Sequence, residues 1–176
     1  MPAPNLYVFS GLPGTGKSSL ARQLAQLRRA AYLRVDTVEA ALLNAGQRAV
    51  TVEGYAVAYA LAEDHLKLGL SVVADCVNPL AVTREAWAEV ARRTGNRPVN
   101  IEVVCSDAEE HRRRVEDRRA DSDQHAGQWS PPDWTALQKS AQDYEPWATP
   151  RLVLDTARAT APDNFIELLN LLGEQG

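Results

Sequence analysis

The octet Gly11-Leu12-Pro13-Gly14-Thr15-Gly16-Lys17-Ser18 stands between an apolar run, 6–10, and a helical pattern that continues through Ser19. It matches the spacing G-x-x-x-x-G-K-[ST] of loops that bind nucleotide phosphates. Glycines let backbone N–H groups turn toward a phosphate, and the N-terminus of the following helix adds partial positive charge. Lys17 can reach the β- and γ-phosphates, and the Ser18 hydroxyl can ligate Mg²⁺. We predict a nucleoside triphosphate site at residues 11–19.

Outside the octet, short apolar runs alternate with stretches of helical periodicity. We expect strands over 6–10, 31–35, 71–74, 101–104 and 152–154. We expect helices over 17–27, 37–43, 53–68, 82–94, 106–119, 130–145 and 163–174. This alternation is typical of an α/β domain with a mainly parallel sheet, in which right-handed crossovers place helices on both faces. We therefore predict one three-layer α/β domain spanning residues 1–176.

Three of the expected helices carry recognisable start signals. Thr51 is placed to cap the helix at 53–68. Ser106 and Glu109 have the spacing of a capping box. Ser130 precedes two prolines, which suit the first turn of a helix.

Three aspartates follow expected strands: Asp36, Asp75 and Asp155. The carboxyl ends of parallel strands share one sheet edge, where ligands of such sheets bind. Asp75 is expected to hold Mg²⁺ beside the phosphates, with a turn or helix cap as the alternative. Asp36 is expected to orient an acceptor hydroxyl or take its proton, and an N-cap of the helix from Thr37 is compatible with that role.

Five arginines lie in the segment from His111 to Arg119, interleaved with acidic residues at i,i+4 spacing. Most of them are expected to form a solvated, salt-bridged face. Arg114 and Arg118 share one helix face just before a polar stretch, and we expect a short lid at about 119–132. Guanidinium groups on such a lid stabilise charge on a transferring phosphoryl group and exclude water.

Other residues are ambiguous in the sequence. Arg84 can face an anionic acceptor, but a surface position is favoured. Trp129, Trp134 and Trp147 are expected to pack the neighbouring helix, with an aromatic substrate wall as the alternative.

The composition excludes several classes of protein. The 176 residues carry a net charge of −4, which argues against nonspecific nucleic-acid binding. No apolar run reaches bilayer-spanning length, and the start of the chain lacks the pattern of a secretion signal. The two cysteines fall near the ends of apolar runs and are expected to be reduced, and the three histidines show no zinc spacing. We expect a cytoplasmic protein.

The chain resembles small P-loop kinases, the group of adenylylsulfate, gluconate, shikimate and chloramphenicol kinases, polynucleotide kinase and zeta toxins. The resemblance rests on the octet, Asp36, Val72-Val-Ala-Asp75 and Arg114-Val-Glu-Asp-Arg118. The segments 53–59, 73–79 and 143–147 resemble bacterial proteins labelled AAA-family ATPases or adenylylsulfate-kinase-like. Cys76 follows Asp75, where AAA+ motors carry a glutamate, and GTPase base-recognition signatures are absent.

The resemblance implies a sheet in 2-3-1-4-5 order and ATP with Mg²⁺ on the octet. It also implies Asp36 as substrate ligand or base, and Arg114 or Arg118 closing over the phosphates. We expect γ-phosphate transfer to a hydroxyl of a small anionic or nucleotide-like acceptor. The alternatives are a slow ATPase acting as a regulatory module, a zeta-toxin-like nucleotide-sugar kinase, and, disfavoured by the acidic balance, a nucleic-acid end kinase. The acceptor, the choice between ATP and GTP, and a monomeric or dimeric state stay open.

Overall fold

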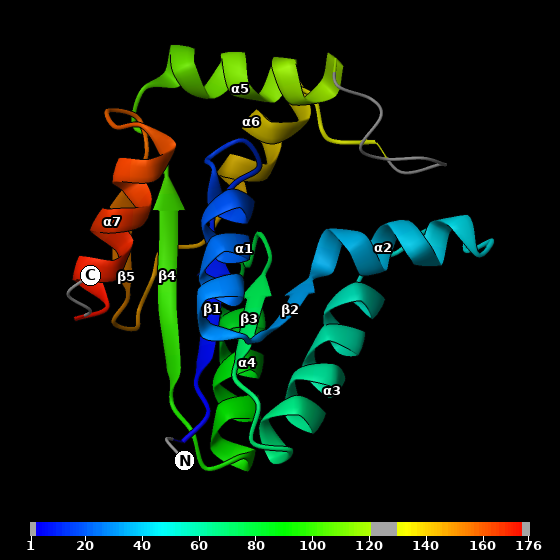
Figure 1. The fold of residues 1–176 in the computed structure, drawn as a ribbon. Coiled ribbons are helices and arrows are strands. Elements are labelled where there is room, and N and C mark those ends of the chain that lie inside the picture. Colours follow the sequence, from blue (N-terminus) through cyan, green and yellow to red (C-terminus); the bar gives the residue numbers. More distant parts are fainter. Residues whose placement is uncertain (1–2, 121–129, 174–176) are drawn as a thin grey trace.

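Five parallel strands form one sheet in the order β2-β3-β1-β4-β5, as expected (Figure 1). The computed structural model describes residues 3–120 and 130–173. The strands are β1 (Leu6–Ser10), β2 (Ala31–Arg34), β3 (Val72–Asp75), β4 (Pro98–Val104) and β5 (Leu152–Asp155). The strand β4 begins three residues earlier than predicted, because Pro98 already pairs with Leu6 of β1.

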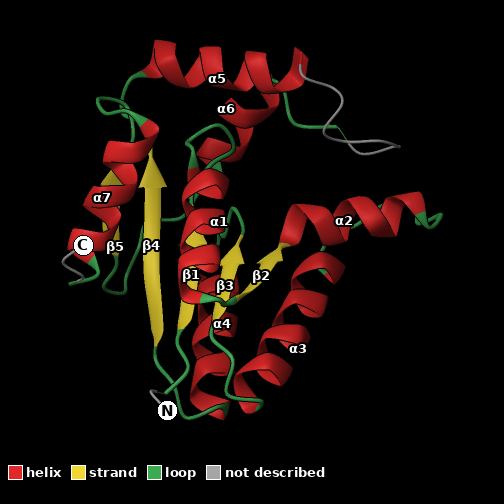
Figure 2. Cartoon of the chain, viewed as in Figure 1, coloured by secondary structure: helices red, strands yellow, loops and turns green. Residues whose placement is uncertain are grey.

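The helices cover both faces of the sheet (Figure 2). They are α1 (Lys17–Arg28), α2 (Val35–Asn44), α3 (Glu53–Lys67), α4 (Ala81–Arg93), α5 (Ala108–Ala120), α6 (Trp134–Gln142) and α7 (Ala161–Leu171). The helices α3 and α4 pack with Leu6 and Val8 on one face of the sheet. The helices α1 and α7 pack with Tyr7 and Phe9 on the other. Burial on both faces explains why β1 is apolar throughout and does not alternate.

Two helices near the sheet edge start differently from the sequence prediction. Asp36 lies inside the first turn of α2, so the N-cap alternative for it is wrong. The cap position of α2 is Arg34, whose side chain makes no capping bond. At α3 the Glu53 carboxylate accepts hydrogen bonds from the backbone N–H groups of Thr51 and Val52, at 2.7 and 3.0 Å. Thr51 is not the cap, because the cap position of α3 is Val52 and the Thr51 hydroxyl donates to the Glu53 carboxylate.

Two further helix starts also differ. Asp107, not Ser106, accepts from the N–H groups of Glu109 and Glu110, both at 3.0 Å. Asp133 caps α6 by accepting from Ala136 N at 2.8 Å, so the two prolines lie before the helix and not in its first turn. In both cases an aspartate nearer the first helical N–H groups takes the capping role.

The lid expected at 119–132 falls mostly on 121–129, outside the described residues, and so does Trp129. At the start of that segment α5 crosses above the carboxyl edge of the sheet, and α6 lies beneath it (Figure 1). Within the described part of the chain, no helix has the length and apolar character needed to cross a membrane.

Candidate active site

The glycine-rich octet follows β1 and turns into α1, as its residue types require. Gly11, Gly14 and Gly16 have φ values of 139°, 82° and 86°, a region that L side chains rarely adopt. A Cβ on Gly11 would lie 2.2 Å from the carbonyl oxygen of Val103, and one on Gly14 would lie 2.6 Å from Cγ2 of Val115. The loop is therefore wedged between β4 and α5, where side chains at these two positions have no room.

Two hydrogen bonds hold the loop from outside. The imidazole of His111 bonds through Nε2 to the carbonyl oxygen of Pro13 at 2.7 Å. The Thr156 hydroxyl donates to the carbonyl oxygen of Thr15 at 2.7 Å and accepts from Nη1 of Arg114 at 2.8 Å. The loop shape is thus supported from α5 and from the segment after β5, neither of which the octet itself reveals.

Lys17 and Asp75 form a buried ion pair at the base of the loop. Lys17 Nζ lies 2.6 Å from Asp75 Oδ1, and the Tyr32 hydroxyl donates to Oδ2, also at 2.6 Å. Burial alone would raise the pKa of the Asp75 carboxyl, but the Lys17 ammonium, the Tyr32 hydroxyl and the Ser18 hydroxyl hold it below its usual range. Burial and the neighbouring carboxylate raise the pKa of Tyr32, which keeps its hydroxyl protonated as a donor.

The donor atoms beside the loop suit magnesium held together with nucleotide phosphates. Mg²⁺ prefers hard oxygen ligands and takes one or two carboxylates plus phosphates and water. Asp75 supplies a carboxylate, and the Ser18 hydroxyl lies close enough to influence its pKa. Among the described residues, no group of three or more His, Cys, Asp or Glu gathers to hold a metal alone. The metal role of Ser18 and Asp75 stays a prediction.

A cleft of about 300 Å³ opens over the octet, and many of its lining side chains are positively charged. We call it the phosphate cleft. It is lined by Leu12, Pro13, Gly14, Thr15, Gly16, Lys17, Ser18, Ser19, Arg22, Arg34, Arg114 and Arg118. Both predicted arginines are present, and the structure adds Arg22 from α1 and Arg34 from the end of β2. Their only sequence signal was their position, one helix turn after the octet and two residues before Asp36. This concentration of guanidinium groups suits a polyphosphate.

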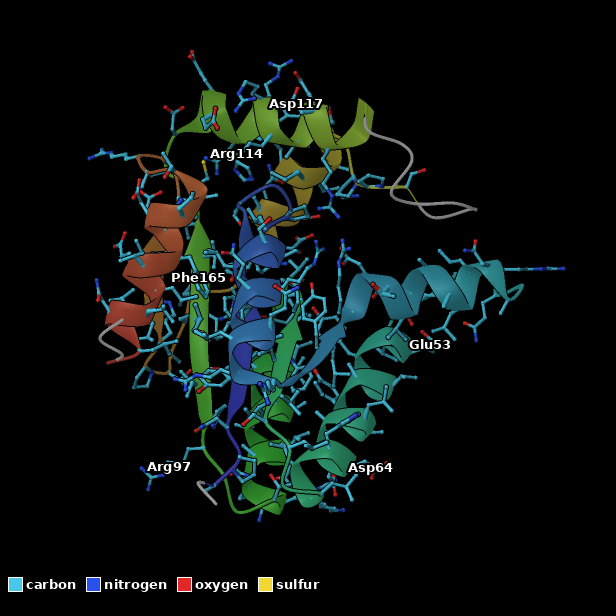
Figure 3. The ribbon with its side chains drawn as sticks, in the orientation of Figure 1. Glu53, Asp64, Arg97, Arg114, Asp117 and Phe165 are labelled. Atoms are coloured by element: carbon cyan, nitrogen blue, oxygen red, sulfur yellow. The ribbon has the colours of Figure 1, made fainter. Side chains whose placement is uncertain are left out.

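The two predicted arginines have different surroundings. Arg114 donates from Nε to Glu110 at 2.7 Å and from Nη2 to the carbonyl oxygen of Thr156 at 3.0 Å. Figure 3 shows it below α5, toward the sheet. Arg118 reaches Asp36 instead, with Nη2 at 3.5 Å from Oδ2. Arg114 is held in place by α5 and the segment after β5, whereas Arg118 bridges to α2.

Asp36 lies between the phosphate cleft and a second cavity. Its Oδ2 is 3.1 Å from Nη2 of Arg34, and it also contacts Arg118. The second cavity has a volume of about 620 Å³. It is lined by Val35, Asp36, Glu39, Thr51, Val52, Tyr55, Ala56, Tyr59, Val77, Pro79, Leu80, Val82, Thr83, Ala86, Ser140 and Asp143. Asp36 therefore touches residues of the phosphate cleft while it faces a separate pocket of ligand size.

The lining of the second cavity is apolar with three carboxylates, and among the described residues it includes no Lys, Arg or His. Burial, and then the nearby Asp36 carboxylate, raise the pKa of Glu39 to about 7. Sequence reasoning missed Glu39, because nothing in its neighbourhood separates it from a surface glutamate on α2. An anionic acceptor, as expected from the sequence, finds no counter-charge in this lining.

Arg84 has neither of the roles considered from sequence. It is only 7% exposed, and it donates to the backbone carbonyl oxygens of Asn78, Pro79, Glu145 and Pro146. Its guanidinium carbon lies 4.2 Å from the ring centroid of Trp147. The surface position favoured from sequence is therefore wrong, because this side chain ties the loop after β3 to the segment after α6.

The other candidate residues make hydrogen bonds and packing contacts within the fold. Asp155 accepts from the backbone N–H groups of Ser106 and Ala157, at 3.0 and 3.1 Å. Trp134 packs edge-on against His111, with ring centroids 5.5 Å apart. Trp147 donates from Nε1 to Glu102 at 3.0 Å. Trp134 thus packs α6 against α5, as expected, whereas the contacts of Trp147 are with β4 and Arg84 rather than with α6.

Several solved structures share this fold. The adenylylsulfate (APS) kinase CysC of Mycobacterium tuberculosis, in complex with AMPPNP and APS, is 20% identical with a TM-score of 0.69, covering 98% of this chain and 100% of that chain. A gluconokinase of Sinorhizobium meliloti is 17% identical with a TM-score of 0.62, covering 98% of both chains. Kti12 of Chaetomium thermophilum, in complex with ADP-AlF3, is 20% identical with a TM-score of 0.69, covering 94% and 98%.

At these identities the similarity shows the fold alone, a P-loop NTPase-like α/β fold. No curated protein sequence matches this chain. A family profile described as AAA domain matches residues 6–130, which include the octet, Asp36, Asp75 and α5. The chain therefore belongs to the AAA domain family.

Proposed function

We propose that this protein is an ATP-dependent phosphotransferase that moves the γ-phosphate to a hydroxyl of a small molecule bound in the cavity beside Asp36. The observation that carries the proposal is the position of Asp36. It lines the 620 Å³ cavity, and its carboxylate contacts Arg34 and Arg118, which line the phosphate cleft. A hydroxyl bound at Asp36 would therefore lie next to the γ-phosphate.

In the proposed reaction the acceptor hydroxyl donates its proton to Asp36 as its oxygen attacks the γ-phosphorus. A new bond forms between the acceptor oxygen and phosphorus, the bond from the γ-phosphorus to the β,γ-bridging oxygen breaks, and ADP leaves. Arg34 and Arg118 offset the charge on the transferring group. Little covalent chemistry is asked of the protein, so position and electrostatics suffice.

Lys17 has two partners in this scheme. It is paired with Asp75 at 2.6 Å, and the same ammonium would bind the β- and γ-phosphates when ATP occupies the loop. Ser18 and Asp75 would hold Mg²⁺, which, when bound, neutralises phosphate charge. Tyr32 keeps one oxygen of Asp75 oriented while the lysine shifts.

The similarity to solved kinases supports the class of reaction. The neighbour from M. tuberculosis was solved with AMPPNP and APS, and that from C. thermophilum with ADP-AlF3. Each of these ligands includes a nucleotide. The fold is therefore one that other proteins use to bind nucleotides, while the acceptor of this chain has to come from its own cavity.

The test is transfer of labelled γ-phosphate from ATP to a collection of small hydroxyl compounds. Wild-type protein should produce a labelled small molecule, and Asp36→Asn should lower the transfer rate by about 100-fold or more, because it removes the proposed base. Nucleotide affinity should change little in Asp36→Asn and fall strongly in Lys17→Ala. The matched control is Asp64→Asn, an exposed aspartate on α3 that lines neither cavity.

Two results would contradict the proposal. One is equal transfer by wild type and Asp36→Asn. The other is ATP hydrolysis with no labelled acceptor from any compound, which would favour the slow ATPase of a regulatory module.

A further inference from the structure

We propose that the phosphate acceptor is a cationic, largely apolar alcohol, whose hydroxyl lies at Asp36 and whose amine pairs with Glu39. The inference rests on the proposed function of the site and narrows its substrate class. It replaces the anionic or nucleotide-like acceptor expected from the sequence. Three properties of the cavity carry it: its apolar walls, an uncompensated carboxylate, and the separation of charges between the two cavities.

The lining side chains of the cavity suit a ligand with a hydrocarbon or aromatic group. Large apolar side chains normally avoid water, yet Val52, Val82 and Leu80 are 70%, 65% and 37% exposed, and all three line this cavity. Tyr55 and Tyr59 add aromatic surface, with ring centroids 6.0 Å apart. A volume of about 620 Å³ lies in the range of pockets that enclose molecules of drug size.

Glu39 is a partly buried carboxylate without a counter-ion. Among the described residues it takes part in no ion pair or hydrogen bond, and its pKa is raised by burial and by the like charge of Asp36. A Cβ on Gly54 of α3 would lie 2.5 Å from Glu39 Cγ and 3.0 Å from Oε1, so the glycine makes room for this side chain. Buried charges in proteins are normally paired, and a cation on the ligand would supply the missing partner.

Charges are separated between the two cavities. Lys17 and all four arginines of the site line the phosphate cleft. The carboxylates of Asp36, Glu39 and Asp143 line the acceptor cavity, with no cation among its described lining residues. An acceptor with a carboxylate, sulfate or phosphate would meet repulsion there, whereas an ammonium group would be attracted.

The spacing of the two acidic residues allows one small molecule to reach both. Asp36 and Glu39 are three positions apart on α2, so they lie on the same helix face with Cβ atoms about 5–6 Å apart. With the amine held at Glu39, the hydroxyl is directed to Asp36 and the phosphate cleft. Transfer follows the reaction described above, in which the hydroxyl proton passes to Asp36 and ADP leaves.

The test compares three probes that share a phenyl group and one hydroxyl: phenylalaninol (cationic), hydrocinnamyl alcohol (neutral) and phenyllactate (anionic). Their binding to wild-type protein is measured by calorimetric titration without nucleotide. Phenylalaninol should bind at least about tenfold more tightly than phenyllactate, the effect of one charge-assisted contact. Glu39→Gln should remove most of that preference.

Two more variants complete the experiment. Asp143→Asn should weaken the preference less than Glu39→Gln, since Asp143 is exposed at the end of α6. The control Asp64→Asn should keep the full preference, because Asp64 lies toward the other end of α3 from Glu53, away from the cavity (Figure 3). Thermal unfolding of each variant checks that it is folded at the titration temperature.

Three outcomes would overturn the inference: no binding of phenylalaninol at millimolar concentration, equal binding of the three probes, or a preference that survives Glu39→Gln. A parallel titration with AMPPNP separates this inference from the proposed function. If AMPPNP binds through Lys17 but the probes show no cation preference, the acceptor class is wrong while phosphotransfer stands. If the cation preference holds but no hydroxyl compound is ever phosphorylated, the proposed function fails while the cavity specificity stands.

Discussion

Replacing Asp75 with asparagine should destabilise the protein by about 3 kcal/mol at neutral pH. The substitution keeps the size of the side chain and one oxygen acceptor, but it removes the charge that compensates Lys17. The side chains of Asp75 and Lys17 are 1% and 9% exposed, so solvent screens their interaction little. Breaking a buried ion pair by removing one partner costs about 3–5 kcal/mol, and the retained hydrogen bond places this change at the lower end.

The pH dependence of this loss has a definite sign. The folded-state pKa of Asp75 lies below its ordinary value of 3.8, so its stabilisation is fully present above that pH. It is lost as the pH falls through the folded-state pKa, where the carboxyl takes up a proton. The difference between wild type and Asp75→Asn should therefore be constant from neutral pH down to about pH 5 and shrink in stronger acid.

Urea titrations followed by circular dichroism measure the difference. A loss of about 3 kcal/mol corresponds to a fall in melting temperature of roughly 6–12 °C for a chain of this size. Adding AMPPNP with EDTA should recover more stability in Asp75→Asn than in wild type. In the variant Lys17 is already free for phosphate, whereas in wild type it must leave the carboxylate.

A loss below about 1 kcal/mol, the range of solvent-exposed ion pairs, would contradict a strong buried interaction between Lys17 and Asp75. So would a difference that persists undiminished in strong acid. A control substitution, Asp117→Asn, removes a carboxylate from an exposed pair with Arg113 and should leave the urea midpoint nearly unchanged.

Three further predictions concern the loop, the buried arginine and Glu39. Gly14→Ala should cost about 1–3 kcal/mol and weaken AMPPNP binding in a titration, because φ is 82° and the methyl meets Val115; unchanged affinity would contradict the loop geometry. Arg84→Met should cost about 3 kcal/mol in urea unfolding, because four backbone carbonyls lose their donor, and Arg84→Lys should recover little of it; full recovery by lysine would show that only charge matters. Glu39→Gln should leave the melting temperature unchanged at pH 4.5 and raise it above pH 7. The pKa of Glu39 rises from 4.5 to about 7 on folding, so ionisation destabilises the wild type increasingly across this interval; a variant less stable than wild type at about pH 8 would refute this.

Much of the fold was predictable because its signals are local. The octet and the apolar runs identified all five strands, and their alternation with helices implied a parallel sheet. Helix starts were less predictable, as at Asp36, Thr51 and Ser106. The cap positions of α2 and α3 are Arg34 and Val52, and neither side chain makes a capping bond. At α5 two neighbouring residues could cap the same N–H groups, and Asp107 does so in place of Ser106.

The candidate site likewise combines residues that local sequence identified with residues that it did not. Lys17 and Ser18 were identifiable because one contiguous octet shapes its own backbone, and Asp36 and Asp75 because strand ends share one edge. Arg84 was misread because its four partners come from loops far apart in the sequence.

A glycine-rich loop on a parallel α/β sheet could be recognised from the sequence alone, because the loop is one contiguous octet and each strand is one short apolar run. The cavity proposed for the acceptor, and the charge around it, came from tertiary packing. The cavity is lined from α2, α3, the segment from β3 into α4, and the end of α6. Its acidity comes from Asp36 and Glu39, which are neighbours on α2, and from Asp143, which joins them only when the end of α6 packs beside α2 and α3.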